Sequence, residues 1–254
     1  MNLLKIVKKD NYVIVKLNRG KVNAINLAMI ETLNTLFQSL KVDNTVEGVI
    51  LTGQPHFFTA GLDLIELYDY DKATIKSLLV QFVDLYHKLV KFPKPLIAAI
   101  TGHAPAAGTV LTIPCDYRVM AIGEKYTIGL HEIKVNIGLH QDIVDGYAFW
   151  LGKGLTARYL LEGKLMNPEE AKTAGYVDKV CPMEDVLENA EQQMATYLKA
   201  DPQIFQSIKF KARKNWIENL GKNEDSEIAE SLAIWWKPEV RKKMKKFVEK
   251  LTTK

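Results

Sequence analysis

Hydrophobic positions in the first half of the chain alternate between the period of a strand and that of a helix. Apolar side chains spaced by three and four residues predict amphipathic helices over residues 27–40 and 75–89, and Asn26 is placed to cap the first one. Short continuous apolar runs between these segments are typical of buried strands. The predicted strands span residues 3–8, 12–17, 46–51, 96–100, 116–122 and 126–128.

Helical patterns dominate after residue 155. The order of elements therefore predicts an α/β fold in which strand–strand–helix units repeat, followed by a helical C-terminal region. A short buried helix is also expected over residues 106–113, ahead of Pro114. The later predicted helices span residues 156–162, 168–174, 185–199, 202–219, 226–236 and 238–251.

The composition excludes several classes of protein. Of the 254 residues, 47% are hydrophobic and 25% are charged, which is too apolar and too balanced for a disordered chain. The longest apolar runs are far shorter than the roughly 20 residues that a membrane span needs. The N-terminus lacks the pattern of a secretory signal, so we expect a cytoplasmic protein without a membrane partner. Cys115 and Cys181 are too few for a disulfide framework or a zinc site.

The net charge of +4 arises at the end of the chain. Residues 201–254 hold 13 basic and 8 acidic side chains, and the rest of the chain is close to neutral. A solvated helix face is the simplest interpretation of this excess. A net charge this small does not by itself indicate a nucleic-acid partner.

Two segments place small residues directly after an apolar strand and before a helical pattern. They span residues 57–64 and 102–108. The first N–H groups of a helix have no partner within the helix and can point at an anion, and small side chains let a ligand approach the backbone. Two such turns facing one point would form an oxyanion hole, although tight packing alone also explains each segment.

A third segment, residues 128–133, places the carboxylate of Glu132 among apolar neighbours. Burial would raise the pKa of this carboxyl group and make it a better base near neutral pH. From local sequence alone, an ordinary surface glutamate at a strand end is the alternative.

These segments belong to a longer ordered set that is specific as a whole. The set comprises Asn18-Arg19, Val22-Asn23-Ala24-Ile25-Asn26, Thr59-Ala60-Gly61-Leu62-Asp63, Lys94-Pro95-Leu96-Ile97-Ala98-Ala99-Ile100-Thr101-Gly102, Cys115-Asp116-Tyr117-Arg118-Val119, Gly129-Leu130-His131-Glu132, Asn167-Pro168-Glu169-Glu170-Ala171 and Ala174-Gly175-Tyr176-Val177. With it, the chain resembles the enoyl-CoA hydratase/isomerase (crotonase) superfamily from about residue 4 to about residue 200.

The resemblance implies a crotonase fold with a spiral core of repeated β-β-α units. It implies an acyl-CoA-binding catalytic core over residues 1–200 and a helical trimerisation region over residues 201–254. The expected partner is an acyl-CoA thioester, with coenzyme A entering as part of the substrate and with no separate cofactor or metal. A homotrimer or hexamer is expected.

The resemblance also implies the site residues. The backbone amides of Leu62 and Ala107 correspond to the oxyanion-hole donors, and alanine stands at the second position where the family commonly has glycine. Asp63 is expected to cap a helix rather than touch the substrate, and Asp116 is expected to be structural. The candidates for substrate contact are Lys21, Val22, Ala24, Ala60, Gly61, His103 and Val110.

The residue at position 110 distinguishes between the reactions of the superfamily. Hydratases resemble one another in using two glutamates, which correspond here to Val110 and Glu132. Water addition needs water activation as well as protonation of the α-carbon, whereas one carboxylate can take a proton from C2 and return it at C4. The chain most resembles the Δ3,Δ2-enoyl-CoA isomerases, so we expect conversion of 3-enoyl-CoA to 2-trans-enoyl-CoA in fatty acid metabolism, with Glu132 as the catalytic residue.

Two alternatives stay open. One is another reaction on the same fold, such as hydration, thioester hydrolysis or decarboxylation, and the other is a non-catalytic acyl-CoA-binding or RNA-binding member. The family has Asn where this chain has His131, which either tunes the pKa of Glu132 or faces outward. We also hypothesise that part of the basic tail holds the phosphates of coenzyme A. The candidates are Lys209, Lys211, Arg213, Lys214 and the basic residues within 241–246.

Overall fold

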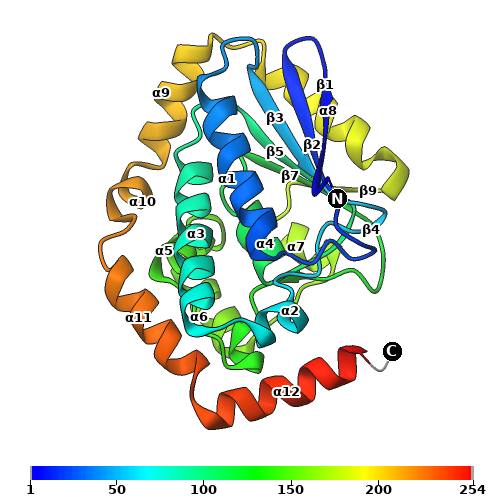
Figure 1. Cartoon of the computed structure of the whole chain (residues 1–254). Helices are drawn as coiled ribbons and strands as arrows, with labels where there is room; N and C mark the ends of the chain where they lie inside the picture. Colours follow the sequence, from blue (N-terminus) through cyan, green and yellow to red (C-terminus); the bar gives the residue numbers. More distant parts are fainter. Residues whose placement is uncertain (1, 253–254) are drawn as a thin grey trace.

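The computed structural model describes residues 2–252. Residue 1 of the predicted catalytic core and residues 253–254 of the predicted helical C-terminal region lie outside the described residues. A six-stranded sheet forms the centre of the structure (Figure 1). β1 pairs with β2 in antiparallel fashion, and every later neighbour is parallel. In spatial order the strands are β1 (Leu4–Lys8), β2 (Tyr12–Leu17), β3 (Gly48–Thr52), β5 (Leu96–Ile100), β7 (Tyr117–Ala121) and β9 (Lys179–Cys181).

Helices cover both faces of this sheet. The helices α1 (Leu27–Val42) and α3 (Lys72–Val90) pack side by side on one face, and α8 (Val186–Tyr197) covers the other. Successive strand side chains point to opposite faces, so Leu51 joins the large core beneath α1 and α3 while Ile50 joins the smaller core beneath α8. Continuous apolar runs were the correct signal for β3 and β5, because both faces of these strands are buried, whereas most of β1 is exposed.

A second, smaller sheet carries the two turns rich in small residues. It consists of β4 (His56–Phe57), β6 (Gly102–Pro105) and β8 (Ile128–Gly129), all parallel. These strands follow β3, β5 and β7 directly in the chain, so each repeat contributes one strand to each sheet. The predicted strand–strand–helix repetition is therefore present in the structure.

The C-terminal helices run down one side of the molecule and then beneath it (Figure 1). The prediction of a single helix over residues 202–219 is wrong, because the helix is interrupted at Arg213. In the second helix, Trp216 packs into the hydrophobic core. Trp235 packs into the core of its own chain. None of the helices within residues 2–252 has the length and apolar content needed to cross a membrane. These last helices are α9 (Pro202–Ala212), α10 (Lys214–Asn219), α11 (Glu224–Trp235) and α12 (Pro238–Thr252).

The hydrophobic periodicity did not predict helix α5 (Gln141–Leu151). Its apolar positions Ile143, Tyr147 and Leu151 recur every four residues, but Gly146 interrupts the pattern. Glycine is required there because a side chain would collide with the Tyr86 hydroxyl group. Strands β4, β6 and β9 were also missed, since they are only two to four residues long. The remaining elements are α2 (Leu64–Asp69), α4 (Ala107–Thr112), α6 (Lys153–Glu162), α7 (Pro168–Thr173) and the 3₁₀ helices Glu132–Val135 and Met183–Asp185.

A buried ion cluster attaches the C-terminal helices to the sheet. Asp116 accepts hydrogen bonds from Lys209 Nζ at 2.7 Å, from Arg213 Nη2 at 2.8 Å and from the Leu96 N–H at 2.8 Å. Burial lowers the pKa of Lys209 to about 8, and the Asp116 carboxylate opposes this shift. Asp116 is therefore structural, as expected. The hypothesis that Lys209 and Arg213 hold coenzyme A phosphates is wrong, because both cations are buried against Asp116.

Replacing Asp116 tests how much this cluster stabilises the fold. We expect Asp116→Ala to lower the free energy of unfolding by about 3–5 kcal/mol, because it leaves two buried cations without their counter-ion. Equilibrium urea unfolding measures the change. Glu218→Gln, which removes one partner of the exposed Lys214–Glu218 pair, is the matched control and should change stability by less than about 0.5 kcal/mol. A loss below about 1 kcal/mol for Asp116→Ala would contradict the assignment.

Candidate active site

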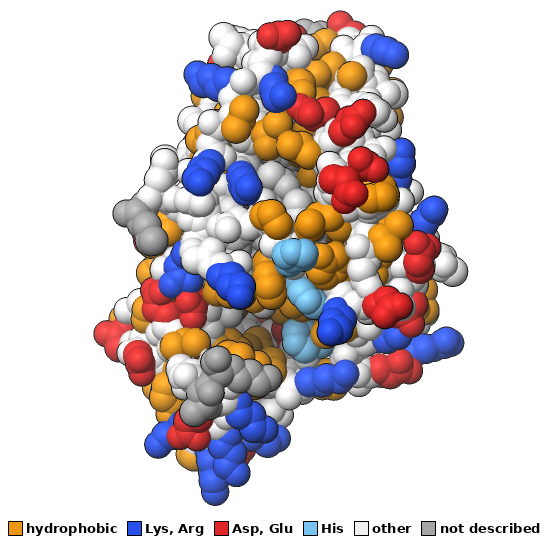
Figure 2. Space-filling view, turned by 90° about the vertical axis from the view of Figure 1, so that its right-hand side faces the viewer, with side chains coloured by type: hydrophobic (Ala, Val, Ile, Leu, Met, Phe, Trp, Pro, Cys, Tyr) orange, Lys and Arg blue, Asp and Glu red, His pale blue; other side chains and the backbone are white. Residues whose placement is uncertain are grey.

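A largely apolar cavity of about 510 Å³ opens beside the second sheet. Its walls come from the turns after β4 and β6, from α2 and α3, from the segment after β8, and from α11 and α12. Figure 2 shows one face of the molecule with a hollow bordered by hydrophobic side chains and histidines. The ionisable or hydroxyl side chains that line the cavity are few: Asp63, His131, Glu132, His140 and Ser231.

Glu132 is a buried carboxylic acid in this cavity. It begins the 3₁₀ helix after β8, and only 7% of the residue is exposed. Burial raises the pKa of Glu132 to about 7, and the N–H groups of Glu132 and His131 offset part of that shift. Its Oε2 atom has no hydrogen-bond partner among residues 2–252. A carboxyl group with these properties can take up and release a proton near neutral pH.

The first small-residue turn presents the N–H of Leu62. Gly61 adopts a φ of +94°, which glycine tolerates best. The Ile25 N–H donates to the Gly61 carbonyl at 2.8 Å, and the Asp63 N–H donates to the Ile25 carbonyl at 2.8 Å. The peptide groups on either side of Leu62 are thus paired, whereas within the described chain no acceptor pairs with the Leu62 N–H.

The second turn presents the N–H of Ala107, the first residue of α4. Ala106 has a φ of +50°, and its N–H donates to the Gly129 carbonyl at 2.9 Å. No acceptor in residues 2–252 pairs with the Ala107 N–H. A Cβ atom added to Gly61 would lie 3.8 Å from the Ala107 nitrogen, so the two turns face each other closely. Two adjacent free amides of this kind can stabilise a negatively charged oxygen.

The structure divides the predicted substrate contacts into two groups. Val22, Ala24, Ala60 and Val110 line the cavity together with Leu62, Ala107 and Glu132. Lys21, Gly61 and His103 are not among the lining residues.

The three residues outside the cavity wall differ in what they do. Gly61 contributes through its backbone, as described above, and Lys21 is exposed. His103 is not among the residues that line the cavity, and its contact with the substrate stays a prediction. Its ring packs against Phe57 at 5.1 Å between centroids and hydrogen-bonds to Thr127 Oγ1 at 3.2 Å. Phe57 is the ring that lines the cavity, so His103 supports the wall from behind.

His131 lines the cavity, and the suggestion that it faces outward is wrong. Burial and the nearby Lys134 lower its pKa, so the imidazole is neutral at pH 7. Of the groups of His131, it is the backbone N–H that acts on the pKa of Glu132, and it lowers that pKa.

Sequence reasoning missed most of the apolar wall. The spacing by three and four residues in α3 showed that this helix has an apolar face, but not what that face covers. The missed lining residues include Leu79, Phe82 and Val83 of α3, Ile137, Leu139, His140 and Ile143 around the start of α5, Ile228 and Ser231 of α11, and Phe247 and Leu251 of α12.

Comparison with known proteins gives this geometry its context. The family described as Enoyl-CoA hydratase/isomerase matches residues 8–254. The chain belongs to this family. The predicted crotonase fold is confirmed, because the chain superposes on the crystal structure of human mitochondrial delta3-delta2-enoyl-CoA isomerase with a TM-score of 0.94 at 27% identity, covering 99% of both chains.

Curated relatives carry two kinds of name. Enoyl-CoA delta isomerase 1, mitochondrial, of Mus musculus is 33% identical over 242 residues, which cover 95% of this chain and 84% of the relative. The 2,3-dehydroadipyl-CoA hydratase of Escherichia coli (strain K12) is 31% identical over 221 residues, covering 85% and 83%. Relatives named as isomerases and relatives named as hydratases are therefore about equally identical in sequence to this chain.

Because Glu132 is buried, its ionisation makes the stability of the folded protein depend on pH, and Glu132→Gln tests this. The folded state binds the Glu132 proton more tightly than an unfolded chain, so this group lowers stability as the pH rises from about 4.5 to about 7. We expect Glu132→Gln to be more stable than the parent by on the order of 1–3 kcal/mol at pH 8, with a smaller gain at pH 5. Urea unfolding at both pH values measures this, with the exposed Glu169→Gln as control. A gain that is equal at both pH values would contradict the assigned pKa.

Proposed function

We propose that this family member is a Δ3,Δ2-enoyl-CoA isomerase that converts 3-enoyl-CoA to 2-trans-enoyl-CoA in fatty acid metabolism. The single observation that carries the proposal is that Glu132 is the one unpaired carboxylate among the described residues that line the cavity. The other lining carboxylate, Asp63, caps α2 and is bound to Arg19 at 2.6 Å.

In this reaction the thioester oxygen accepts hydrogen bonds from the N–H groups of Leu62 and Ala107. The ionised Glu132 removes a proton from C2, and the electron pair spreads over a dienolate from the thioester oxygen to C4. The same carboxyl group then returns its proton to C4, which leaves the double bond between C2 and C3. Each backbone donor contributes on the order of 10²- to 10³-fold in rate, because negative charge develops on the oxygen only during the reaction.

Val110 supports isomerisation over hydration. It lines the cavity and is buried in α4, where hydratases of the family resemble one another in having a second glutamate. A valine side chain can neither bind nor deprotonate water, and an apolar wall disfavours a water molecule near C3. Hydration remains the competing function because the Escherichia coli relative is named a hydratase.

Other features of the proposal rest on family resemblance. Coenzyme A enters as part of the substrate, and the reaction requires no separate cofactor. The homotrimer or hexamer and the boundary between residues 1–200 and 201–254 stay predictions. The cytoplasmic location also stays a prediction, and the name of the Mus musculus relative assigns that protein to mitochondria.

Removal of the carboxylate tests the chemistry directly. We expect Glu132→Gln to lower kcat for 3-hexenoyl-CoA by at least about 10³-fold, because it removes the only carboxylate without a cationic partner among the described residues that line the cavity. Product analysis by chromatography measures isomerisation, and crotonyl-CoA measures hydration by the parent enzyme. Glu169→Gln, an exposed glutamate of α7, is the matched control and should retain full activity. Rapid hydration of crotonyl-CoA by the parent would favour the hydratase instead.

The pH dependence of the reaction follows from the pKa of Glu132. Only the ionised carboxylate can start the reaction, so kcat/KM should rise about tenfold per pH unit below pH 7 and level off above it. Initial rates with 3-hexenoyl-CoA between pH 5.5 and 8.5 measure the profile, with circular dichroism as the check that the protein stays folded. A flat profile over this range would exclude Glu132 as the base.

A further inference from the structure

A network of charged side chains lies directly behind the Leu62 turn. The guanidinium of Arg19 donates through Nη1 to Asp63 Oδ2 at 2.6 Å and to the Ala24 carbonyl at 2.8 Å. Through Nη2 it donates to Glu66 Oε2 at 2.6 Å. The Arg19 side chain is 23% exposed and does not line the cavity. Its contacts are therefore made to the protein itself.

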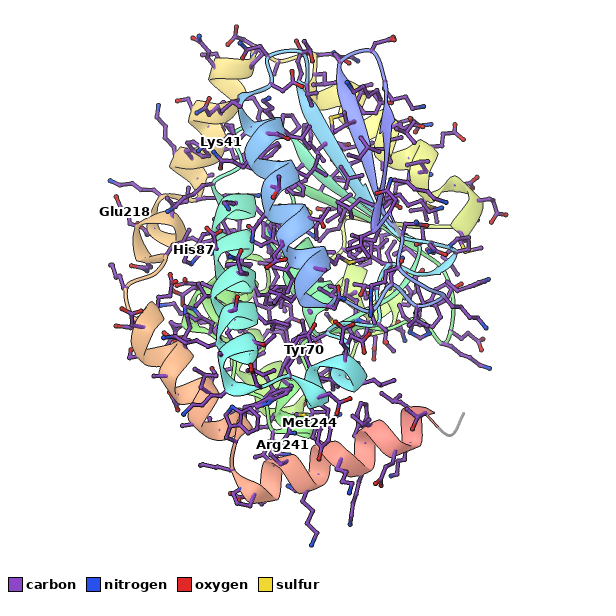
Figure 3. The ribbon with its side chains drawn as sticks, in the orientation of Figure 1. Lys41, Tyr70, His87, Glu218, Arg241 and Met244 are labelled. Carbon is purple, nitrogen blue, oxygen red and sulfur yellow. The ribbon has the colours of Figure 1, made fainter. Side chains whose placement is uncertain are left out.

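Glu66 extends this network to two helix ends. It accepts a hydrogen bond from Asn26 Nδ2 at 3.0 Å and another from the Tyr70 hydroxyl group. Asn26 caps α1 by accepting from the Met29 N–H, and Tyr70 lies at the end of α2, close to the start of α1 in Figure 3. The network thus fixes the start of α1 relative to α2.

Arg19 binds one residue on each side of the backbone bridge that pairs Ile25 with Leu62. Asp63 follows Leu62 in the chain, and Ala24 precedes Ile25, the residue that pairs with the peptide groups around Leu62. The planar guanidinium of Arg19 therefore binds both paired segments, one through the Ala24 carbonyl and the other through the Asp63 carboxylate. The fixed geometry of its N–H donors suits several acceptors at once. The Arg19 N–H also donates to Asn23 Oδ1 at 2.8 Å, and Asn23 has a φ of +51°.

We propose that Arg19 is a positioning residue that aims the Leu62 N–H at the substrate thioester oxygen. This inference rests on the proposed function only in assigning that amide to the thioester oxygen. Oxyanion stabilisation depends on donor placement to within a fraction of an ångström, so a loosened turn weakens catalysis while the apolar cavity still binds the acyl chain. Lysine presents a point charge and cannot reach all three acceptors at the angles that Arg19 satisfies.

Kinetics separate positioning from general destabilisation. We expect Arg19→Gln to lower kcat for 3-hexenoyl-CoA by about 10- to 100-fold while KM changes less than threefold. Arg19→Lys should restore only part of kcat. Glu66→Gln, which weakens the same network from its other side, should act in the same direction with a smaller effect. The exposed Arg158→Gln is the matched control and should leave kcat unchanged.

A spectroscopic readout makes the test independent of turnover. Hexanoyl-CoA with a ¹³C label at the thioester carbonyl is unreactive in isomerisation, and difference infrared spectroscopy reports the polarisation of its carbonyl group when bound. We expect a lowered carbonyl frequency in the parent enzyme and a return toward the free value in Arg19→Gln.

Two results would overturn the role of Arg19. One is an unchanged carbonyl frequency in Arg19→Gln, and the other is an unchanged kcat accompanied only by a lower melting temperature. If Arg19→Gln does not fold, the same measurements on Arg19→Lys and Glu66→Gln decide. A parent enzyme that shifts the carbonyl frequency but does not isomerise 3-hexenoyl-CoA would remove the proposed function alone.

Discussion

The burial of one carboxyl group in an apolar cavity is the constraint on which the rest of this site depends. Glu132 has no polar side chain within hydrogen-bonding distance of its Oε2 atom, and the surrounding wall comes mainly from aliphatic and aromatic residues. Water would restore an ordinary acidity to this group, so the wall must be continuous. Several separate parts of the fold supply this wall, among them the loop after β2, the turns after the short strands, α2 and α3, the segment after β8, and the last two helices.

Backbone amides supply what the apolar wall cannot. The free N–H groups of Leu62 and Ala107 carry no net charge, so they do not lower the pKa of Glu132 as a nearby cation would. They can nevertheless stabilise a negatively charged oxygen close to them. Their placement requires unusual backbone conformations at Gly61 and Ala106, which the fold maintains by pairing the neighbouring peptide groups with Ile25 and Gly129. A non-glycine residue at positive φ costs about 1–3 kcal/mol, and here Ala106 stands directly before the unpaired Ala107 N–H.

The sequence predicted those features that depend on neighbours close in the chain. Apolar runs located the long strands to within about two residues, and small residues between a strand and a helix located both turns. Features that depend on distant partners were not predictable in this way. Lys209 and Arg213 read as surface charges because their counter-ion, Asp116, lies more than ninety residues away in the chain. Likewise, the apolar spacing of Phe247 and Leu251 could not reveal that they close the cavity.

The position of α12 ties the site to the order of protein synthesis. The cavity wall contains Val22 near one end of the chain and Leu251 near the other, so the wall is complete only after residue 251 has been synthesised. During translation the two turns and Glu132 are synthesised before the residues of α11 and α12 that supply one side of the cavity. A chain interrupted before residue 238 would expose an apolar hollow to water.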